Sequence, residues 1–190
     1  MSTTNFLKVG LTGTIGSGKS LALSYFKKFN WKVFSCDDAV HGLLQNNPYV
    51  KNQILKAFGN QVMDEDHSII RSHLAAIVFQ DAEARETLET ILHPIVRNEW
   101  QKSISEEPFN HWVIEIPLLF EKNLEKFFDL SVCVGCAPEV QMDRLTQRGW
   151  SSNEIQLRLN SQLPLQEKIS RADTVFWNDG TPQWLETQIK

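Results

Sequence analysis

A glycine-rich segment near the N-terminus, Gly13 to Ser20, has the G-x-x-x-x-G-K-S spacing of a P-loop. Its glycines lack a Cβ atom, so successive main-chain N–H groups can surround a polyphosphate at the N-terminus of a helix. Lys19 adds a mobile positive charge that can follow the γ-phosphate, and the Ser20 hydroxyl is a hard oxygen ligand suited to Mg²⁺. The pattern predicts that ATP and Mg²⁺ are bound, with Ser20 on the metal and the nucleotide held by Gly13, Thr14, Ile15, Gly16, Ser17, Gly18, Lys19, Ser20 and Leu21.

The residues on both sides of this loop fit a strand and a helix. The apolar run from Phe6 to Leu11 predicts a strand, and residues 22–29 carry apolar side chains at helical spacing. The alternative is a glycine-rich turn that binds nothing. The strand–loop–helix setting argues against it.

Asp37 is the first acidic residue after a second predicted strand, Trp31 to Phe34. Ligands of open α/β sheets gather at the carboxyl ends of the strands, so we expect Asp37 at the same edge as the P-loop. Two compatible roles are open for it. It is an N-cap of a helix over residues 39–45, or the group that orients and deprotonates the attacking hydroxyl in phosphoryl transfer.

Arg144 and Arg148 are four residues apart in a helix that Pro138 begins, so they are predicted to share one face. Surface arginines are usually solvated. Beside a P-loop, however, they can neutralise the charge on the transferring phosphoryl group. A capping box from Ser151 to Glu154 predicts a second helix, and residues 138–165 therefore read as a lid that closes over ATP.

The block from about 47 to 105 is predicted to be nearly all helical. Asn47-Pro48 is a helix start, and Asp81 begins a long helix that Pro94 should kink or divide. We interpret this block as an insertion beside the sheet that accepts the second substrate.

Apolar runs at 112–116, 129–134 and 174–177 predict three further strands. The fold class is therefore α/β: a P-loop NTPase fold with a five-stranded parallel sheet flanked by helices. We expect a single domain over residues 1–190, with a core at 1–46, 106–137 and 170–190, the helical insertion at about 47–105 and the lid at about 138–165.

The composition, 42% hydrophobic and 22% charged in 190 residues, is that of one globular domain without an apolar run long enough to span a bilayer. The first residues lack the features of a signal peptide, which predicts a cytoplasmic location. A net charge of −4 argues against a surface that coats nucleic acid. Neither nucleic acid nor membrane is expected as a partner, and the oligomeric state is open.

Cys133 and Cys136 have the C-x-x-C spacing of zinc and redox sites. No second cysteine or histidine pair at zinc-like spacing is apparent, and the two residues close a predicted strand instead of opening a helix. We expect them to have a packing role, with redox or metal chemistry as the alternative.

The chain resembles the dephospho-CoA kinase family along nearly its whole length. An ordered set of motifs carries this resemblance and is more specific than a P-loop alone: Gly10 to Ser20, Cys36-Asp37, Phe58-Gly59, Arg71 with Val78-Phe79, Leu92-His93-Pro94, Pro117 to Glu121, Gln141 with Arg144 and Arg148, Gln162, and Ala172-Asp173 with Asn178. Ser35 departs from the pattern, because many members have an acid there.

The resemblance implies ATP-dependent phosphorylation of the ribose 3′-hydroxyl of dephospho-CoA, which gives coenzyme A and ADP. The family's counterpart of Asp37 contacts the acceptor hydroxyl and is the proposed base, and its counterpart of Arg144 belongs to the lid. With Lys19, these two form the expected catalytic set. Because the insertion is the family's acceptor domain, Arg71 and His93 are candidates for binding the substrate; capping or packing is the alternative for His93.

Two other readings share the P-loop. One is a nucleoside-monophosphate-type or other small-molecule kinase on the same scaffold. The other is a P-loop switch ATPase, in which an acid at a strand end holds the Mg²⁺ shell; here the candidate strand carries Glu115.

Overall fold

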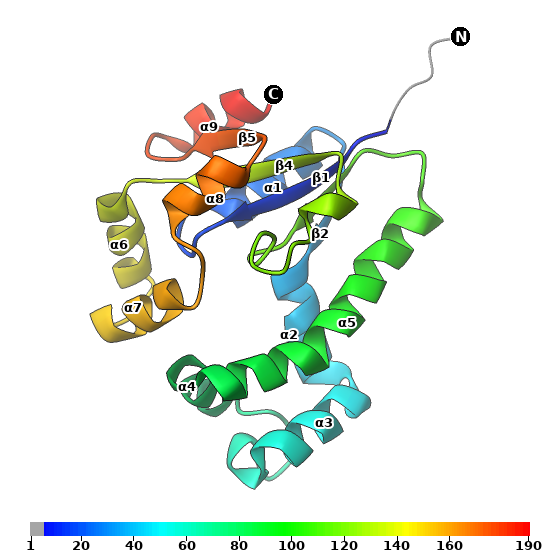
Figure 1. Cartoon of the computed structure of the whole chain (residues 1–190), viewed down its shortest axis with the longest axis vertical. Helices are drawn as coiled ribbons and strands as arrows, with labels where there is room; N and C mark the ends of the chain where they lie inside the picture. The colour runs from blue at the N-terminus through cyan, green and yellow to red at the C-terminus, as the bar shows by residue number, and fades with distance from the viewer. Residues whose placement is uncertain (1–5) are drawn as a thin grey trace. The chain divides into compact units, whose positions relative to one another are not determined.

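The computed structural model describes residues 6–190 and contains a five-stranded parallel sheet (Figure 1). The strand order is β2-β3-β1-β4-β5, so the strand that leads into the P-loop lies in the middle. The strands are β1 (Lys8–Gly13), β2 (Lys32–Ser35), β3 (Trp112–Glu115), β4 (Leu130–Gly135) and β5 (Thr174–Trp177). The predicted α/β class and the five parallel strands are confirmed.

Helices cover the sheet, and side chains from alternate strand positions form its core. On one face, Val9 and Leu11 of β1 pack with α1 (Lys19–Lys28) and with Leu185 of α9 (Pro182–Ile189). On the other face, Gly10 leaves room for Leu119 and Phe128 from the segment after β3, and α8 (Leu165–Arg171) contacts β1 and β4. Both faces of the central strands are buried, which explains their continuous apolar sequences.

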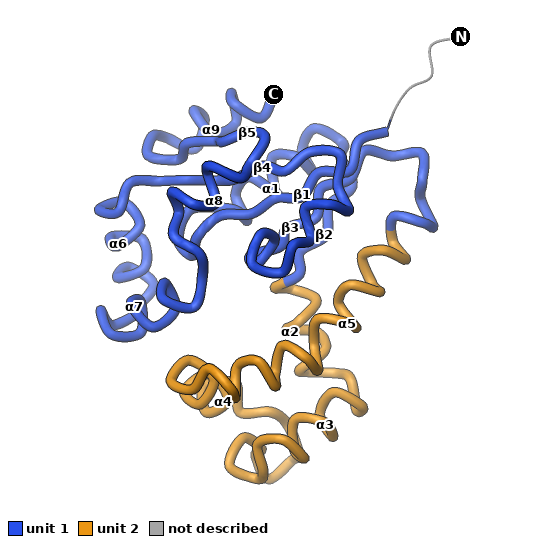
Figure 2. Tube along the Cα trace, viewed as in Figure 1, with its two compact units in different colours: residues 1–36, 104–190 blue, residues 37–103 orange. Residues whose placement is uncertain are grey.

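The chain forms two compact units (Figure 2). The sheet unit contains the residues up to 36 together with 104–190, and the helical unit contains 37–103. The sequence placed the start of the helical block at about 47. In the structure α2 (Cys36–Asn46) belongs to the helical unit from Asp37 onward.

The helical unit also contains α3 (Pro48–Phe58), a short 3-10 turn η1 (Asn60–Val62), α4 (Arg71–Gln80) and most of α5 (Ala82–Glu106). The predicted caps are present: Asn47 Oδ1 accepts a hydrogen bond from Val50 N at 3.1 Å, and Asp81 Oδ1 accepts one from Glu83 N at 2.8 Å. Of the two outcomes predicted at Pro94, a division of the helix is wrong, because α5 continues through Pro94 as one helix. Figure 1 shows its ribbon bending part-way along.

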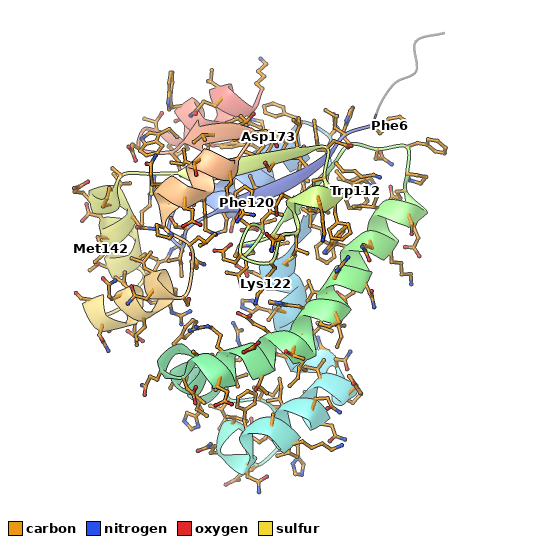
Figure 3. All side chains as sticks on the ribbon, viewed as in Figure 1. Phe6, Trp112, Phe120, Lys122, Met142 and Asp173 are labelled. Carbon is orange, nitrogen blue, oxygen red and sulfur yellow. The ribbon has the colours of Figure 1, made fainter. Side chains whose placement is uncertain are left out.

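The last part of the sheet unit contains α6 (Pro138–Gln147), α7 (Ser152–Asn160), α8 and α9, and η2 (Glu125–Phe127) lies between β3 and β4. The capping box at Ser151 is confirmed, with Glu154 N donating to its hydroxyl. Asp173 accepts hydrogen bonds from Ser131 Oγ at 2.6 Å and Ser131 N at 2.8 Å, which hold β5 against β4 and lower the Asp173 pKa (Figure 3). Among residues 6–190, no helix has the length and apolar character needed to cross a membrane.

Candidate active site

The P-loop runs from the end of β1 to the first residue of α1, as its sequence predicts. Gly18 has a φ angle of 99°, in the left-handed region, and immediately precedes the helix. A Cβ atom at Gly18 would lie only 2.1 Å from Asn178 Nδ2. Glycine is therefore required there both by the backbone angle and by the approach of Asn178.

Lys19 and Ser20 are the first two residues of α1 and lie in different environments. Lys19 is buried, with Nζ 3.3 Å from the carbonyl oxygen of Thr14, which accepts its hydrogen bond. Ser20 is exposed, and Leu21 packs partly against the core. The lysine ammonium thus lies at the concave side of the loop, where a phosphate would replace a carbonyl as its partner.

Side chains from distant parts of the sheet unit hold the loop. Asn178, which follows β5, donates from Nδ2 to the Ser17 carbonyl oxygen at 2.8 Å. Gln141 of α6 donates from Nε2 to Thr14 Oγ1 at 2.9 Å and to the Ile15 carbonyl oxygen at 2.5 Å. The shape of the loop is therefore set by residues more than a hundred positions away in sequence.

Arg144 lies beside this cluster. Its Nη2 atom donates to the Asn178 carbonyl oxygen at 2.8 Å, whereas its buried Nη1 atom has no hydrogen-bond partner among residues 6–190. The buried Ser17 hydroxyl is likewise without one in the described part of the chain. Buried polar atoms without partners are rare in folded proteins, and a guanidinium N–H beside a P-loop is suited to a phosphate oxygen.

Arg148 lies at the C-cap position of α6 and is exposed. The two predicted arginines are thus unlike one another in the structure: Arg144 is directed into the cluster around the loop, and Arg148 lies where the helix ends.

The three cysteines are buried and free. Burial raises the pKa of the Cys133 thiol to about 11. Burial also raises the Cys136 pKa, while the neighbouring Arg144 guanidinium acts in the opposite direction. Protonated, enclosed thiols are poor nucleophiles and poor metal ligands, which favours the packing role.

Asp37 is the second residue of α2 and is exposed. Its predicted role as an N-cap is wrong, because the helix begins at Cys36 and Asp37 lies in its first turn. A carboxylate in this turn is stabilised by the positive end of the helix. β1 and β2 both pair in parallel with β3, with Leu11 and Ser35 on either side of Glu115. The carboxyl ends of β1 and β2 therefore lie at the same edge of the sheet.

The two predicted acceptor residues occupy different helices of the helical unit. Arg71 is the first residue of α4, and its Nη2 atom donates to Nε2 of His41 at 2.5 Å. The arginine has no acceptor, so the hydrogen of neutral His41 must be on Nδ1. His93 is half-buried within α5, one residue before Pro94.

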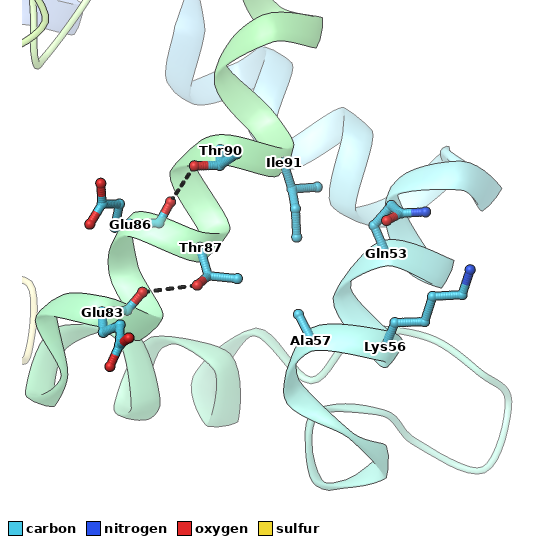
Figure 4. A pocket seen from close by; sticks show the side chains of 8 residues that line it. All are labelled: Gln53, Lys56, Ala57, Glu83, Glu86, Thr87, Thr90 and Ile91. Carbon is cyan, nitrogen blue, oxygen red and sulfur yellow. Dashed lines mark hydrogen bonds between the residues drawn. The ribbon is translucent and has the colours of Figure 1, made fainter.

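A groove of about 460 Å³ lies between α3 and α5 of the helical unit (Figure 4). Residues of mixed polarity line it, and neither Arg71 nor His93 is among them: Gln53, Lys56, Ala57, Glu83, Glu86, Thr87, Thr90 and Ile91. Thr87 and Thr90 donate their hydroxyl hydrogens to the carbonyl oxygens of Glu83 and Glu86. The groove is therefore separate from the acceptor residues that the sequence suggested.

The residues around the P-loop suit a magnesium nucleotide. The exposed Ser20 hydroxyl supplies one hard oxygen ligand, and Mg²⁺ in phosphoryl-transfer sites takes most of its other ligands from water and phosphate. The described residues contain no cluster of three or more histidine, cysteine, aspartate or glutamate side chains that could hold a metal by themselves. The donor set thus fits a metal that is held together with the nucleotide.

Sequence reasoning gave Gln141, Gln162 and Asn178 no individual role. Gln141 precedes Arg144 by three residues, so it shares the arginine's helix face, and that spacing could have drawn attention to it. Gln162 and Asn178 lie in connecting segments, where no periodicity marks the direction of a side chain. Only the folded structure shows that they reach the loop.

The sequence model of the dephospho-CoA kinase family matches residues 7–183. A dephospho-CoA kinase from Bacillus cereus is 36% identical over 186 residues, which are 96% of this chain and 93% of that protein. A crystal structure from Thermus thermophilus is 30% identical with a TM-score of 0.82, over 98% of this chain and 95% of that one. The structure of a dephospho-CoA kinase from Campylobacter jejuni is 25% identical with a TM-score of 0.60, over 96% and 93%.

Proposed function

Because the chain belongs to the dephospho-CoA kinase family, we propose that it transfers the γ-phosphoryl group of ATP to the ribose 3′-hydroxyl of dephospho-CoA and releases coenzyme A and ADP. The observation that carries this proposal is the family match over residues 7–183, which includes the P-loop and the segments that hold it. We place the reaction in the cytoplasm.

The sheet unit supplies the nucleotide side of the mechanism. The P-loop binds the polyphosphate through main-chain N–H groups, and the Ser20 hydroxyl would hold Mg²⁺, which would supply positive charge beside the phosphates. Lys19 exchanges its contact with the Thr14 carbonyl oxygen for a phosphate oxygen, and Arg144 uses its unpaired Nη1 hydrogen atoms in the same way. Positive charge then balances the charge that spreads over the transferring group in the transition state.

The helical unit supplies the acceptor side. Asp37 orients the 3′-hydroxyl and accepts its proton late, because in a loose transition state the nucleophile needs little activation. Arg71 binds an anionic group of dephospho-CoA, and His93 contacts its adenosine end. Residues 138–165 form the lid that excludes water from the transfer, and Arg148 joins Arg144 on the nucleotide when this lid is closed.

An acceptor panel tests the proposal. The purified protein is incubated with magnesium and ATP and with dephospho-CoA, adenosine, AMP or phosphopantetheine, and ADP release is measured. We expect turnover only with dephospho-CoA, and a product that carries the new phosphate on the 3′-oxygen by ³¹P NMR. A 3′-deoxy analogue of dephospho-CoA is the matched control and should be inert.

Two results would contradict the proposal. Preference for another acceptor would indicate a different small-molecule kinase on this scaffold. ATP hydrolysis that does not depend on any acceptor and rises with a protein partner would indicate a switch ATPase.

A further inference from the structure

Both main-chain polar groups of Ile15, in the P-loop, bind side chains from the C-terminal part of the sheet unit. Its N–H donates to Oε1 of Gln162 at 3.1 Å. Its carbonyl oxygen accepts from Nε2 of Gln141 at 2.5 Å. Because the Ile15 peptide groups are in neither a helix nor a strand, these amides satisfy hydrogen-bonding needs that secondary structure does not meet.

The next residue shows how closely this side of the loop is packed. Gly16 has a φ angle of 78°, and a Cβ atom there would lie 3.0 Å from Leu145 and 3.2 Å from Gln141. The chain therefore turns against α6 over residues 14–17, where Ser17 N donates to the Thr14 carbonyl oxygen at 3.2 Å, and Ile15 is fixed inside this turn. A small rotation of the Ile15 peptide would change the direction of the N–H groups that follow it.

The residue after Gln162 is held by a largely buried ion pair. The main-chain N–H of the next residue, Leu163, donates to Oε1 of Glu121 at 2.8 Å. The same oxygen lies 2.7 Å from Nζ of Lys168, whose side chain is fully buried. A buried ion pair with further hydrogen bonds fixes geometry, because moving either partner leaves a charge uncompensated.

The ion pair connects back to the strand that leads into the loop. Lys168 Nζ also donates to the Pro117 carbonyl oxygen at 2.7 Å, and this oxygen accepts a second hydrogen bond from Thr12 Oγ1 at 3.1 Å. Thr12 directly precedes Gly13. The P-loop is thus fixed at its entry through Thr12 and within its first turn through Ile15.

We propose that Gln162 is a positioning residue for the nucleotide: it orients the Ile15 peptide so that the following N–H groups of the P-loop point at the polyphosphate, and the Glu121–Lys168 pair holds Gln162 in place. Gln162 acts through Ile15 and contributes no contact to the reacting atoms. This inference rests on the proposed use of ATP. It does not depend on which acceptor receives the phosphoryl group.

The test compares three variants of the full chain. Gln162→Met keeps the length of the side chain and removes the acceptor, whereas Gln162→Glu keeps an acceptor oxygen. Gln156→Met makes the same change at an exposed glutamine of α7 that bonds Asn160, and serves as the matched control. The measurements are the dissociation constant of magnesium ATP without acceptor, the amide hydrogen exchange of Ile15 by NMR, and the melting temperature.

We expect Gln162→Met to weaken ATP binding about tenfold, the size of effect that loss of one good hydrogen bond produces. It should also speed exchange of the Ile15 amide without lowering the melting temperature by more than a few degrees. Gln162→Glu should stay within about threefold of the parent for ATP, and Gln156→Met should match the parent in all three measurements.

Unchanged ATP affinity in Gln162→Met would overturn the inference, as would equal weakening by the methionine and glutamate variants. Failure of Gln162→Met to fold would assign Gln162 to stability instead of positioning and would also count against it. If the parent chain binds no ATP, the proposed function fails; the Ile15 exchange rate then still shows whether Gln162 fixes that peptide.

Discussion

The sheet unit and the helical unit present their candidate functional residues in different ways. In the sheet unit, Lys19, Arg144 and the P-loop main chain are joined by a continuous set of hydrogen bonds through Asn178 and Gln141. In the helical unit, Arg71 bonds His41, and His93 lies on another helix. The residues proposed to bind the nucleotide are thus joined by hydrogen bonds within the protein, whereas the residues proposed to bind the acceptor lie on separate helices.

The two halves of the proposed reaction should therefore respond differently to mutation. Changes around the P-loop should impair nucleotide binding first. Changes in the helical unit should leave ATP binding intact and act on turnover or on the acceptor.

The largest effect is expected from Lys19→Ala, which removes the buried charge next to the polyphosphate. Both the affinity for ATP and the rate should fall, and we expect kcat/KM to drop by on the order of 10³ or more. Calorimetry with ATP and steady-state kinetics measure the two losses. Lys27→Ala, at an exposed lysine of the same helix, is the control and should behave as the parent. A Lys19 variant with parental affinity and rate would refute the nucleotide site itself.

Asp37→Asn should distinguish the proposed roles of the two units most clearly. The amide still accepts a hydrogen bond but is a far weaker base, so we expect kcat to fall by about 10² while ATP affinity is unchanged. Single-turnover kinetics in a quench-flow instrument isolate the transfer step. Asp38→Asn, one position further along α2, is the matched control. Equal losses at both positions would show that the chemistry does not depend on Asp37 in particular.

A smaller effect is expected from Arg71→Leu. Loss of one charge-assisted contact with the acceptor should raise the KM for dephospho-CoA about tenfold and leave the ATP dissociation constant unchanged. Arg85→Leu makes the same change of charge at another arginine of the helical unit. If Arg71→Leu weakens ATP and leaves the acceptor unaffected, the division of labour between the units is wrong.

The Cys133 thiol should have no effect on activity at neutral pH. It should affect the stability of the protein only at alkaline pH. Its thiol pKa is near 9 in the unfolded chain and about 11 in the folded one. Below pH 9 both states are protonated. Between pH 9 and 11 only the unfolded state loses the proton, so the free energy of unfolding should fall by about 2 kcal/mol over this range.

Urea unfolding at several pH values measures this slope for the parent and for Cys133→Ala. Cys133→Ala has no thiol to titrate at this position. Between pH 9 and 11 its free energy of unfolding should therefore fall by about 2 kcal/mol less than that of the parent, whatever its stability at pH 7. Parallel slopes would show that the thiol does not titrate as burial predicts.

The sequence was sufficient wherever a short local pattern determines the structure. The P-loop, the Asn47 and Asp81 caps and the alternation of strands and helices all follow from spacing within a few residues, and the structure confirms them. Pro94 is instructive, because the sequence left a kink or a division open there, and α5 stays one helix despite a residue that disfavours helix interiors.

The parts that could not be predicted depend on long-range geometry. Nothing in the spacing of Gln162 or Asn178 shows that they meet residues 15 and 17 of the loop. Likewise, α2 begins at Cys36, two residues earlier than a helix capped by Asp37 would, so Asp37 lies in its first turn. The roles of Arg71, His93 and the lid are predictions, and the Arg71→Leu variant above tests the first of them.

The bond between Asn178 and Ser17 spans 161 positions of the chain. During translation, the whole P-loop therefore emerges from the ribosome long before the amide that completes it is synthesised. A nascent chain that ends before Asn178 would carry the full motif without this hydrogen bond. We therefore expect ATP to bind it poorly and to stabilise mainly the nearly complete protein.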